Sequence, residues 1–142
     1  TWREPSNVRE LWTVVNEVLL AKHDSEPTHN VEEMELLISR FAEQIKAFEV
    51  LKDDRLLGGC VLFINGKVVH TQYMAVTDEG RAIGALDYLV HNLIEYYKSE
   101  KSYFSFGIST EEGGTVLNEG LIFQKEGFGA TGLVHDFYRL SV

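Results

Sequence analysis

Polar side chains that could take part in acyl or proton transfer gather in the last third of the chain. They are Ser109, Asn118, Glu119 and Lys125. They follow the apolar run of residues 103–106, which we read as a short buried strand that ends in a glycine-bearing loop. A short helix closed by residues 127–129, Gly-Phe-Gly, comes next. Open α/β sheets usually hold ligands at the carboxyl ends of their strands, so this stretch predicts a site.

Lys125, His70 and Glu119 are the candidate catalytic residues. The Lys125 ammonium could stabilise an oxyanion, or it could simply balance the last turn of a helix. The imidazole of His70 suits a general base, whereas a mid-strand histidine is often a core residue whose nitrogens are paired with neighbours. Glu119 is the other candidate base, although an acidic residue in the first turn of a helix is also explained by the helix dipole.

His23 and His29 lie on either side of an acidic loop broken by Pro27. Their separation of six does not place them on one helical face, and no third ligand has a suitable spacing, so the sequence predicts no metal site. The loop could bind an acceptor or could lock two helices together through polar contacts. Ser109 lacks a Gly-x-Ser-x-Gly elbow, which favours a hydroxyl contact to substrate or backbone over a nucleophilic role.

Two helices are predicted before the first strand. Apolar residues from Val8 to Leu19 recur at three-and-four spacing, which indicates one buried helical face. A second helix begins after Asn30, which can cap it, with Glu33 at the third helical position as in a capping box. The apolar stripe that continues to Phe41 should form the inner face of this helix.

Strand-like patterns then follow. Strands are predicted over residues 45–51, 55–64 and 67–76, with a hairpin turn at Asn65-Gly66. In the third strand, strict alternation places one set of residues on each face: Val68, His70, Gln72 and Met74 on one, and Val69, Thr71, Tyr73 and Ala75 on the other. Helical spacing over residues 83–97 predicts the longest helix, followed by a strand at 103–106, a helix at 116–126 and a strand at 133–140. The order ααβββαβαβ indicates an α/β fold with a mixed, mostly antiparallel sheet and helices on both faces.

Composition narrows the class further. The chain has 142 residues, 44% of them hydrophobic, and a net charge of −9 without a basic cluster. These values suit one domain and disfavour an extended nucleic-acid surface. The single cysteine, Cys60, lies in an apolar run, and the sequence shows neither a signal-peptide pattern nor a membrane span, which favours the cytoplasm. Since the numbering begins at Thr1, we expect residues 1–142 to be a single domain from a longer protein.

The segment of residues 103–129 resembles the strand, Phe-Gly-x-Ser loop and Lys-x-x-Phe-Gly helix end of the FemAB-like branch of the GNAT acyltransferase superfamily. Residues 70–73 and 23–29 are similar to further features of that branch. The order of elements resembles the superfamily along nearly the whole chain, except that the usual first strand is missing before the first helix. This gap agrees with a fragment.

The resemblance implies acetyl-CoA or another acyl-CoA as co-substrate. Its binding residues would be Met74, Val76, Arg81, Ala82 and Gly84. The pyrophosphate loop of the family, Gln/Arg-x-x-Gly-x-Gly/Ala, would be residues 79–84, but Glu79 and Ala82 depart from it, and Arg81 could compensate for Glu79. The same residues could equally form the cap of an ordinary helix. Phe123 stands where many GNAT enzymes keep a tyrosine acid, with Tyr73 and Tyr138 as substitutes.

The resemblance further implies transfer of an acyl group, or of an aminoacyl group from aminoacyl-tRNA, to a small-molecule amine acceptor in cell-envelope biosynthesis. Acceptor contacts are expected from His23, His29, Gln72, Tyr73, Ser109 and Asn118. The alternative is a non-catalytic GNAT-like domain that packs on a companion GNAT-like domain and contributes part of a binding site. The sequence specifies neither the acceptor nor the oligomeric state.

Overall fold

The computed structural model describes residues 1–136 and 138–140, except for the side chains of Lys22 and His23. The chain divides into two compact units, Thr1–Gly107 and Ile108–Val142. Each unit is described by itself.

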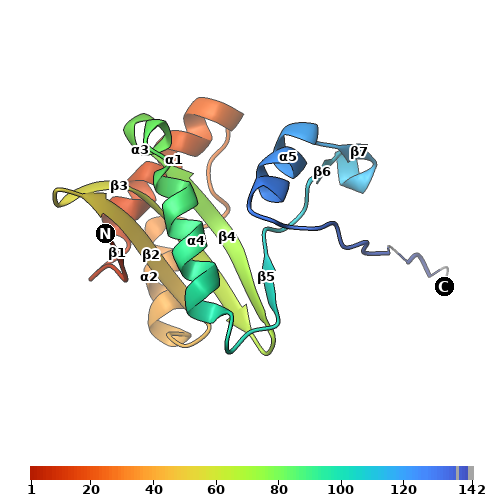
Figure 1. Cartoon of the computed structure of the whole chain (residues 1–142), viewed down its shortest axis with the longest axis horizontal. Coiled ribbons are helices and arrows are strands. Elements are labelled where there is room, and N and C mark those ends of the chain that lie inside the picture. Colours follow the sequence, from red (N-terminus) through yellow and green to blue (C-terminus); the bar gives the residue numbers. More distant parts are fainter. Residues whose placement is uncertain (137, 141–142) are drawn as a thin grey trace. The chain divides into compact units, whose positions relative to one another are not determined.

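A five-stranded sheet forms the centre of the first unit (Figure 1). Its strands are β1 (Trp2–Arg3), β2 (Ile45–Lys52), β3 (Arg55–Asn65), β4 (Val68–Val76) and β5 (Tyr103–Ser105), in the spatial order β1-β2-β3-β4-β5. Three of the four neighbouring pairs are antiparallel, and β4 pairs with β5 in parallel. The predicted mixed, mostly antiparallel sheet is confirmed.

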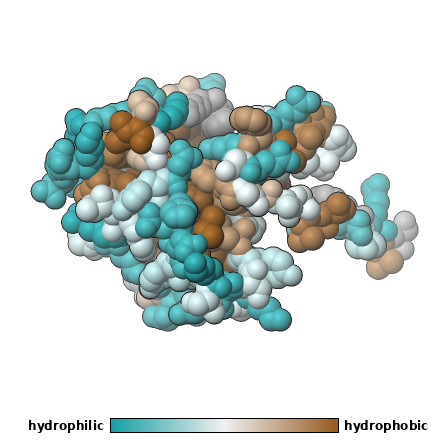
Figure 2. Space-filling view, viewed as in Figure 1, coloured by the Kyte–Doolittle hydropathy of each residue, from teal (hydrophilic) through white to brown (hydrophobic). Residues whose placement is uncertain are grey.

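Helices cover both faces of this sheet, as the sequence predicts. They are α1 (Arg9–His23), α2 (Val31–Arg40), α3 (Asp78–Ala82) and α4 (Ala85–Tyr97). On one face α4 packs Leu89 and Leu93 against Leu62 and Val69. On the other face α1 packs Leu11 and Trp12 in a cluster that includes Met34 of α2. The surface over α4 mixes hydrophilic and neutral residues (Figure 2), which is typical of a helix with one buried face.

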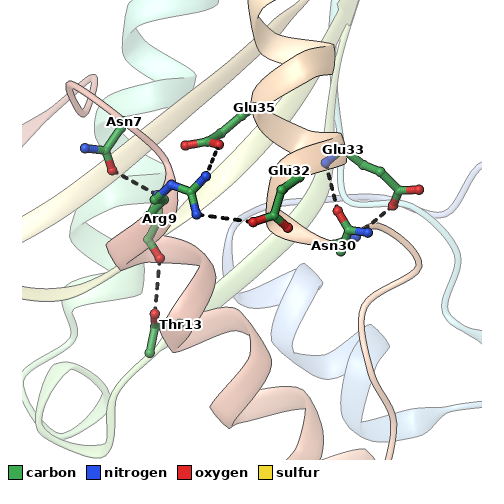
Figure 3. A network of polar contacts seen from close by, with 7 residues as sticks. All are labelled: Asn7, Arg9, Thr13, Asn30, Glu32, Glu33 and Glu35. Atoms are coloured by element: carbon green, nitrogen blue, oxygen red, sulfur yellow. Dashed lines mark hydrogen bonds and ion pairs between the residues drawn. The ribbon is translucent and has the colours of Figure 1, made fainter.

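Polar contacts fix the start of both N-terminal helices (Figure 3). Asn30 and Glu33 form the predicted capping box, in which each side chain accepts a hydrogen bond from the other residue's backbone N–H at 2.8 Å. The Arg9 guanidinium of α1 pairs with Glu32 and Glu35 of α2. These contacts join the two helices that cover one face of the sheet.

Four local features of the first unit differ from the sequence-based expectations. A two-residue strand, β1, precedes the first helix, where no strand was expected. The ring of its Trp2 packs on the ring of Phe48, with 5.6 Å between the ring centroids. The helix expected over residues 83–97 begins only at Ala85, because Gly84 before it has a positive φ, and a separate short helix, α3, ends at Ala82. With 15 residues, α1 is therefore longer than the 13-residue α4.

The remaining two differences concern the hairpin turn between β3 and β4 and the alternation of side chains along β4. Asn65 pairs with Val68, so the two turn residues are 66 and 67 rather than 65 and 66. The pairing shifts between Val61↔Tyr73 and Leu62↔Thr71, which makes Gln72 an extra residue on β4. Such a bulge reverses the alternation. Consequently Val69 packs on the α4 side while Tyr73 and Ala75 pack on the α1 side, so the predicted common face of these three residues is wrong.

The second unit consists of short elements. They are β6 (Thr110–Glu111), the 3-10 turn η1 (Glu112–Gly114), β7 (Val116–Leu117) and α5 (Glu119–Gly127). The predicted helix is present, but residues 116 and 117 form β7 because Val116 pairs with Glu111. The strand predicted over residues 133–140 is not formed: residues 133–136 and 138–140 are irregular, and Phe137 lies outside the described part. None of the described side chains of this unit is fully buried.

Candidate functional site

The parallel pairing of β4 and β5 ends after three residue pairs. Val68 pairs with Tyr103, and His70 pairs with Ser105 in the last pair. The Thr71 hydroxyl donates to the Ser105 carbonyl at 3.2 Å and closes this end of the ladder. β4 continues to Val76, so its later residues have β3 on one side and no described partner from β5 on the other. Met74 and Val76, which were expected to contact a coenzyme, belong to this part of β4, which pairs with β3 but not with β5.

His70 lies at the point where the two strands separate. Its Nδ1 is 3.1 Å from the Ser105 hydroxyl oxygen, which also accepts the Gly107 N–H at 3.3 Å. The tautomer with its proton on Nδ1 donates to Ser105 and leaves Nε2 basic. Gly107 has φ +70°, and a Cβ there would lie 3.2 Å from the His70 Cε1. The glycine therefore lets the backbone pass close to the imidazole edge.

A second polar pair connects the α1–α2 loop to β4. His29 Nδ1 is 2.8 Å from the Tyr73 hydroxyl. The Tyr73 ring meets the fully buried Trp12 edge-on, with 4.9 Å between the ring centroids. The structure thus brings together two of the expected acceptor residues, His29 and Tyr73. The side chain of His23, which was expected beside them, lies outside the described residues.

Residues 79–84, expected to form the pyrophosphate loop, lie mainly in α3, which ends at Ala82. Thr77 caps this helix: its hydroxyl accepts the Gly80 N–H at 3.0 Å, and its carbonyl accepts the Arg81 N–H at 2.9 Å. Gly80 is buried, and a Cβ there would lie 2.6 Å from the Leu57 carbonyl. This glycine is therefore needed for packing against β3.

The charges around α3 are paired differently from the sequence-based expectation. Arg55 of β3 forms an ion pair with Glu79, whereas Arg81 pairs with Asp78 at 3.5 Å. The expectation that Arg81 compensates for Glu79 is thus replaced by a contact from Arg55. The sequence carried no signal for it, because the two residues are 24 positions apart and meet only through the sheet.

The second unit brings Ser109, Asn118 and Lys125 together. The Lys125 ammonium donates to the Ile108 carbonyl and, at 2.9 Å, to the Ser109 hydroxyl. The Asn118 N–H donates to the Ser109 carbonyl at 2.8 Å, and the Asn118 side chain caps α5. Partial burial lowers the pKa of Lys125. Glu119 is exposed in the first turn of α5, where the helix dipole accounts for an acidic residue.

A match to a known protein family shows which family the chain belongs to. Residues 1–112 match the family described as acetyltransferase (GNAT) domain. The chain belongs to the GNAT acetyltransferase domain family. Curated proteins give no significant match. The match covers the whole sheet of the first unit, and with it His70, Ser105 and the α3–α4 region.

Solved structures share the fold of this GNAT domain at low sequence identity. A possible acetyltransferase from Clostridium difficile 630 has a TM-score of 0.77 and 11% identity, over 100% of this chain and 97% of that one. An aminoglycoside acetyltransferase from an uncultured soil metagenomic sample, in complex with sisomicin, has a TM-score of 0.66 and 13% identity, over 99% and 95%. An acetyltransferase of Trypanosoma brucei has a TM-score of 0.65 and 18% identity, over 100% and 99%.

GNAT acetyltransferases use acyl-CoA as co-substrate. The start of α4 is the part of the expected coenzyme segment with an uncapped helix N-terminus, although Asp87 lies in its first turn. Gly84 begins this 13-residue helix in the left-handed conformation, and no side chain caps it. Backbone N–H groups at an uncapped helix start suit phosphate oxygens. Of the expected coenzyme residues, Gly84 has this geometry, whereas Ala82 ends α3 and Arg81 is held by Asp78.

No group of acidic, histidine or cysteine side chains able to hold a metal occurs among the described residues. Within the same part of the chain, no helix has the length and apolar character needed to cross a bilayer.

Replacing Lys125 by Ala should loosen the loop that this lysine holds in the second unit. Loss of the contacts to Ile108 and Ser109 is expected to weaken the Asn118–Ser109 hydrogen bond, since one such bond contributes about 1 kcal/mol. Amide hydrogen exchange at Asn118 should become several-fold faster. Lys98→Ala is the matched control, because Lys98 is exposed directly after α4 and its ammonium pairs with Glu95 rather than with the loop of the second unit. Unchanged exchange at Asn118 would contradict this positioning role.

Proposed function

We propose that this GNAT domain transfers an acyl group from acyl-CoA to a primary amine by direct attack, with His70 as the general base. The observation that carries the proposal is the His70–Ser105 pair at the last rung of the parallel β4–β5 ladder. Beyond this rung none of the described residues of β5 pairs with β4, so we expect a substrate to reach backbone groups of β4 beside the held imidazole.

The chain's own residues would handle the proton of the acceptor. Acyl-CoA supplies the activated thioester carbonyl. His70 Nε2 accepts the proton that the amine nitrogen releases as its new bond to carbon forms, while Ser105 holds Nδ1 in place. The Tyr73 hydroxyl, paired with His29, is a candidate to protonate the leaving sulfur, because Phe123 cannot do so. Lys125 holds Ile108 and Ser109, the beginning of the second unit.

The donor and the biological setting belong to the same proposal. Similarity of residues 103–129 to the FemAB-like branch supports a role in cell-envelope precursor synthesis, where an aminoacyl-tRNA is the competing donor. The net charge of −9 and the uncapped start of α4 favour acyl-CoA. Arg55 also removes one objection to this donor, since it pairs with Glu79 near that helix start.

A second candidate function is a non-catalytic GNAT-like domain that packs on a companion domain. The specific observation in its favour is that Thr77 already engages the N–H groups of Gly80 and Arg81, two residues of the segment that resembles the pyrophosphate loop. On this reading, α3 is purely structural and the start of α4 binds no ligand.

Titration with CoA separates the two candidates. If CoA binds the folded domain, its melting temperature should rise with ligand concentration, by an amount equivalent to about 2.7 kcal/mol at a hundred times Kd. Pantetheine, which lacks the pyrophosphate, should give a smaller rise because it cannot use the start of α4. If neither ligand changes the melting temperature, acyl-CoA is not the donor and the non-catalytic function gains support.

A further inference from the structure

A cavity of about 500 Å³ lies between α2 and the sheet of the first unit. Leu37 of α2 and Phe41, the residue that follows this helix, line one side, and Phe63 and Val68 belong to the strands on the other. His70 also lines it. The volume falls within the range of small-molecule sites, about 300–1,000 Å³. The cavity is thus large enough for a ring or a branched alkyl group.

Strand register explains why the candidate base is among the residues that line this cavity. Ile45 pairs with Phe63, Phe63 with His70, and His70 with Ser105, so these four residues form one row across β2, β3, β4 and β5. Directly paired residues project their side chains to the same face of a sheet. The row therefore runs from the apolar side chains of Ile45 and Phe63 to the imidazole of His70 and its partner Ser105.

The chemistry of the lining is predominantly apolar. Besides the apolar residues, it includes the amides Gln44 and Asn65 and the imidazole of His70, and no Asp, Glu, Lys or Arg is among the described residues that line it. The lining therefore offers apolar contact area and a few neutral polar side chains, but no charged group that could pair with a charged ligand. A polycationic acceptor would find no carboxylate to pair with among these described lining residues.

We infer that this cavity binds the uncharged apolar arm, aryl or branched alkyl, of the amine acceptor and so places the amine beside His70. The inference rests on the proposed function and adds the substrate class. The row that links Phe63 to His70 supplies the geometry: an arm held between Phe63 and α2 leaves the polar end of the molecule at the His70 end of the cavity. Apolar burial supplies affinity, and His70 supplies the polar contact that sets orientation.

Direct binding of 4-phenylbutan-1-ol, an apolar arm without an amine, tests the cavity independently of acyl transfer. Leu37→Trp should fill the space from α2 and weaken binding at least about tenfold, because the phenyl ring loses its burial. Leu36→Trp is the matched control: Leu36 is the neighbouring residue, is 47% exposed and does not line the cavity. Val68→Phe, which narrows the same space from β4, serves as a second variant if Leu37→Trp does not fold.

With acetyl-CoA present, 4-phenylbutylamine should be acetylated with a KM at least about tenfold lower than that of an ether-containing hydrophilic amine of similar length. Binding of the alcohol that is equal in the Leu37→Trp and Leu36→Trp variants would overturn the inference. Equal KM values for the two amines would overturn it as well. Alcohol binding that depends on Leu37, together with no transfer to either amine, would instead overturn the proposed function and leave the cavity as a binding site.

Discussion

Replacing His70 by Asn is expected to lower kcat/KM for acyl transfer about 10²- to 10⁴-fold, the usual contribution of general base catalysis. Asparagine keeps a polar atom that can face the Ser105 hydroxyl but has no basic nitrogen. The melting temperature should therefore change little. Steady-state rates across a pH series should also lose the acid limb that protonation of the base produces in the unmodified protein.

The matched control for this experiment is His91→Asn. His91 is exposed on α4 and belongs to neither the β4–β5 ladder nor the cavity. Its substitution should leave kcat/KM and the pH profile unchanged. If His70→Asn retains the full rate and the same acid limb, His70 is a structural histidine held by Ser105, and another group must accept the proton.

Gly58→Ala is expected to destabilise the first unit by about 3 kcal/mol. Gly58 has φ +143°, a conformation that residues with a side chain rarely adopt. A Cβ at this position would lie 2.2 Å from the Ala75 carbonyl oxygen and 2.6 Å from the Val76 Cα, both in β4. Because these are backbone atoms of the neighbouring strand, a side-chain rotation cannot relieve the overlap.

Chemical or thermal unfolding measures this effect, and we expect a fall in melting temperature of roughly 10 °C. Gly127→Ala is the control, because a Cβ there would meet no atom within 4 Å. It should be neutral or slightly stabilising, as alanine is the better helix former. A Gly58→Ala protein as stable as Gly127→Ala would show that β3 and β4 are not as close at Gly58 as the structure has them.

Much of the first unit follows from local patterns. The Asn30–Glu33 capping box and the strand limits of β2 and β3 were predicted almost to the residue, because capping and alternation are local signals. The bulge at Gln72 was not, since only the pairing with β3 reveals an extra residue. The irregular path of residues 133–136 shows the same limit: apolar alternation predicts a strand only where a partner strand is available.

The candidate site shows a similar division. His70 stood out by its chemistry, and Ser109, Asn118 and Lys125 stood out as a cluster of polar residues, which the structure confirms as neighbours. Ser105 was present in the same stretch but gained a role only through its register with His70, 35 residues away. Contacts of this kind depend on which strands become neighbours, which no short motif encodes.

The central claim, acyl transfer from acyl-CoA to an amine assisted by His70, is tested most directly by one measurement. The purified domain is incubated with acetyl-CoA and 4-phenylbutylamine, and mass spectrometry quantifies the N-acetylated amine while a thiol reagent quantifies free CoA. Cys60 does not interfere, because it is buried and burial raises the pKa of its thiol. We predict equal amounts of N-acetylated amine and CoA, with both nearly absent for His70→Asn. No N-acetylated product, or the same yield from His70→Asn, would contradict the account.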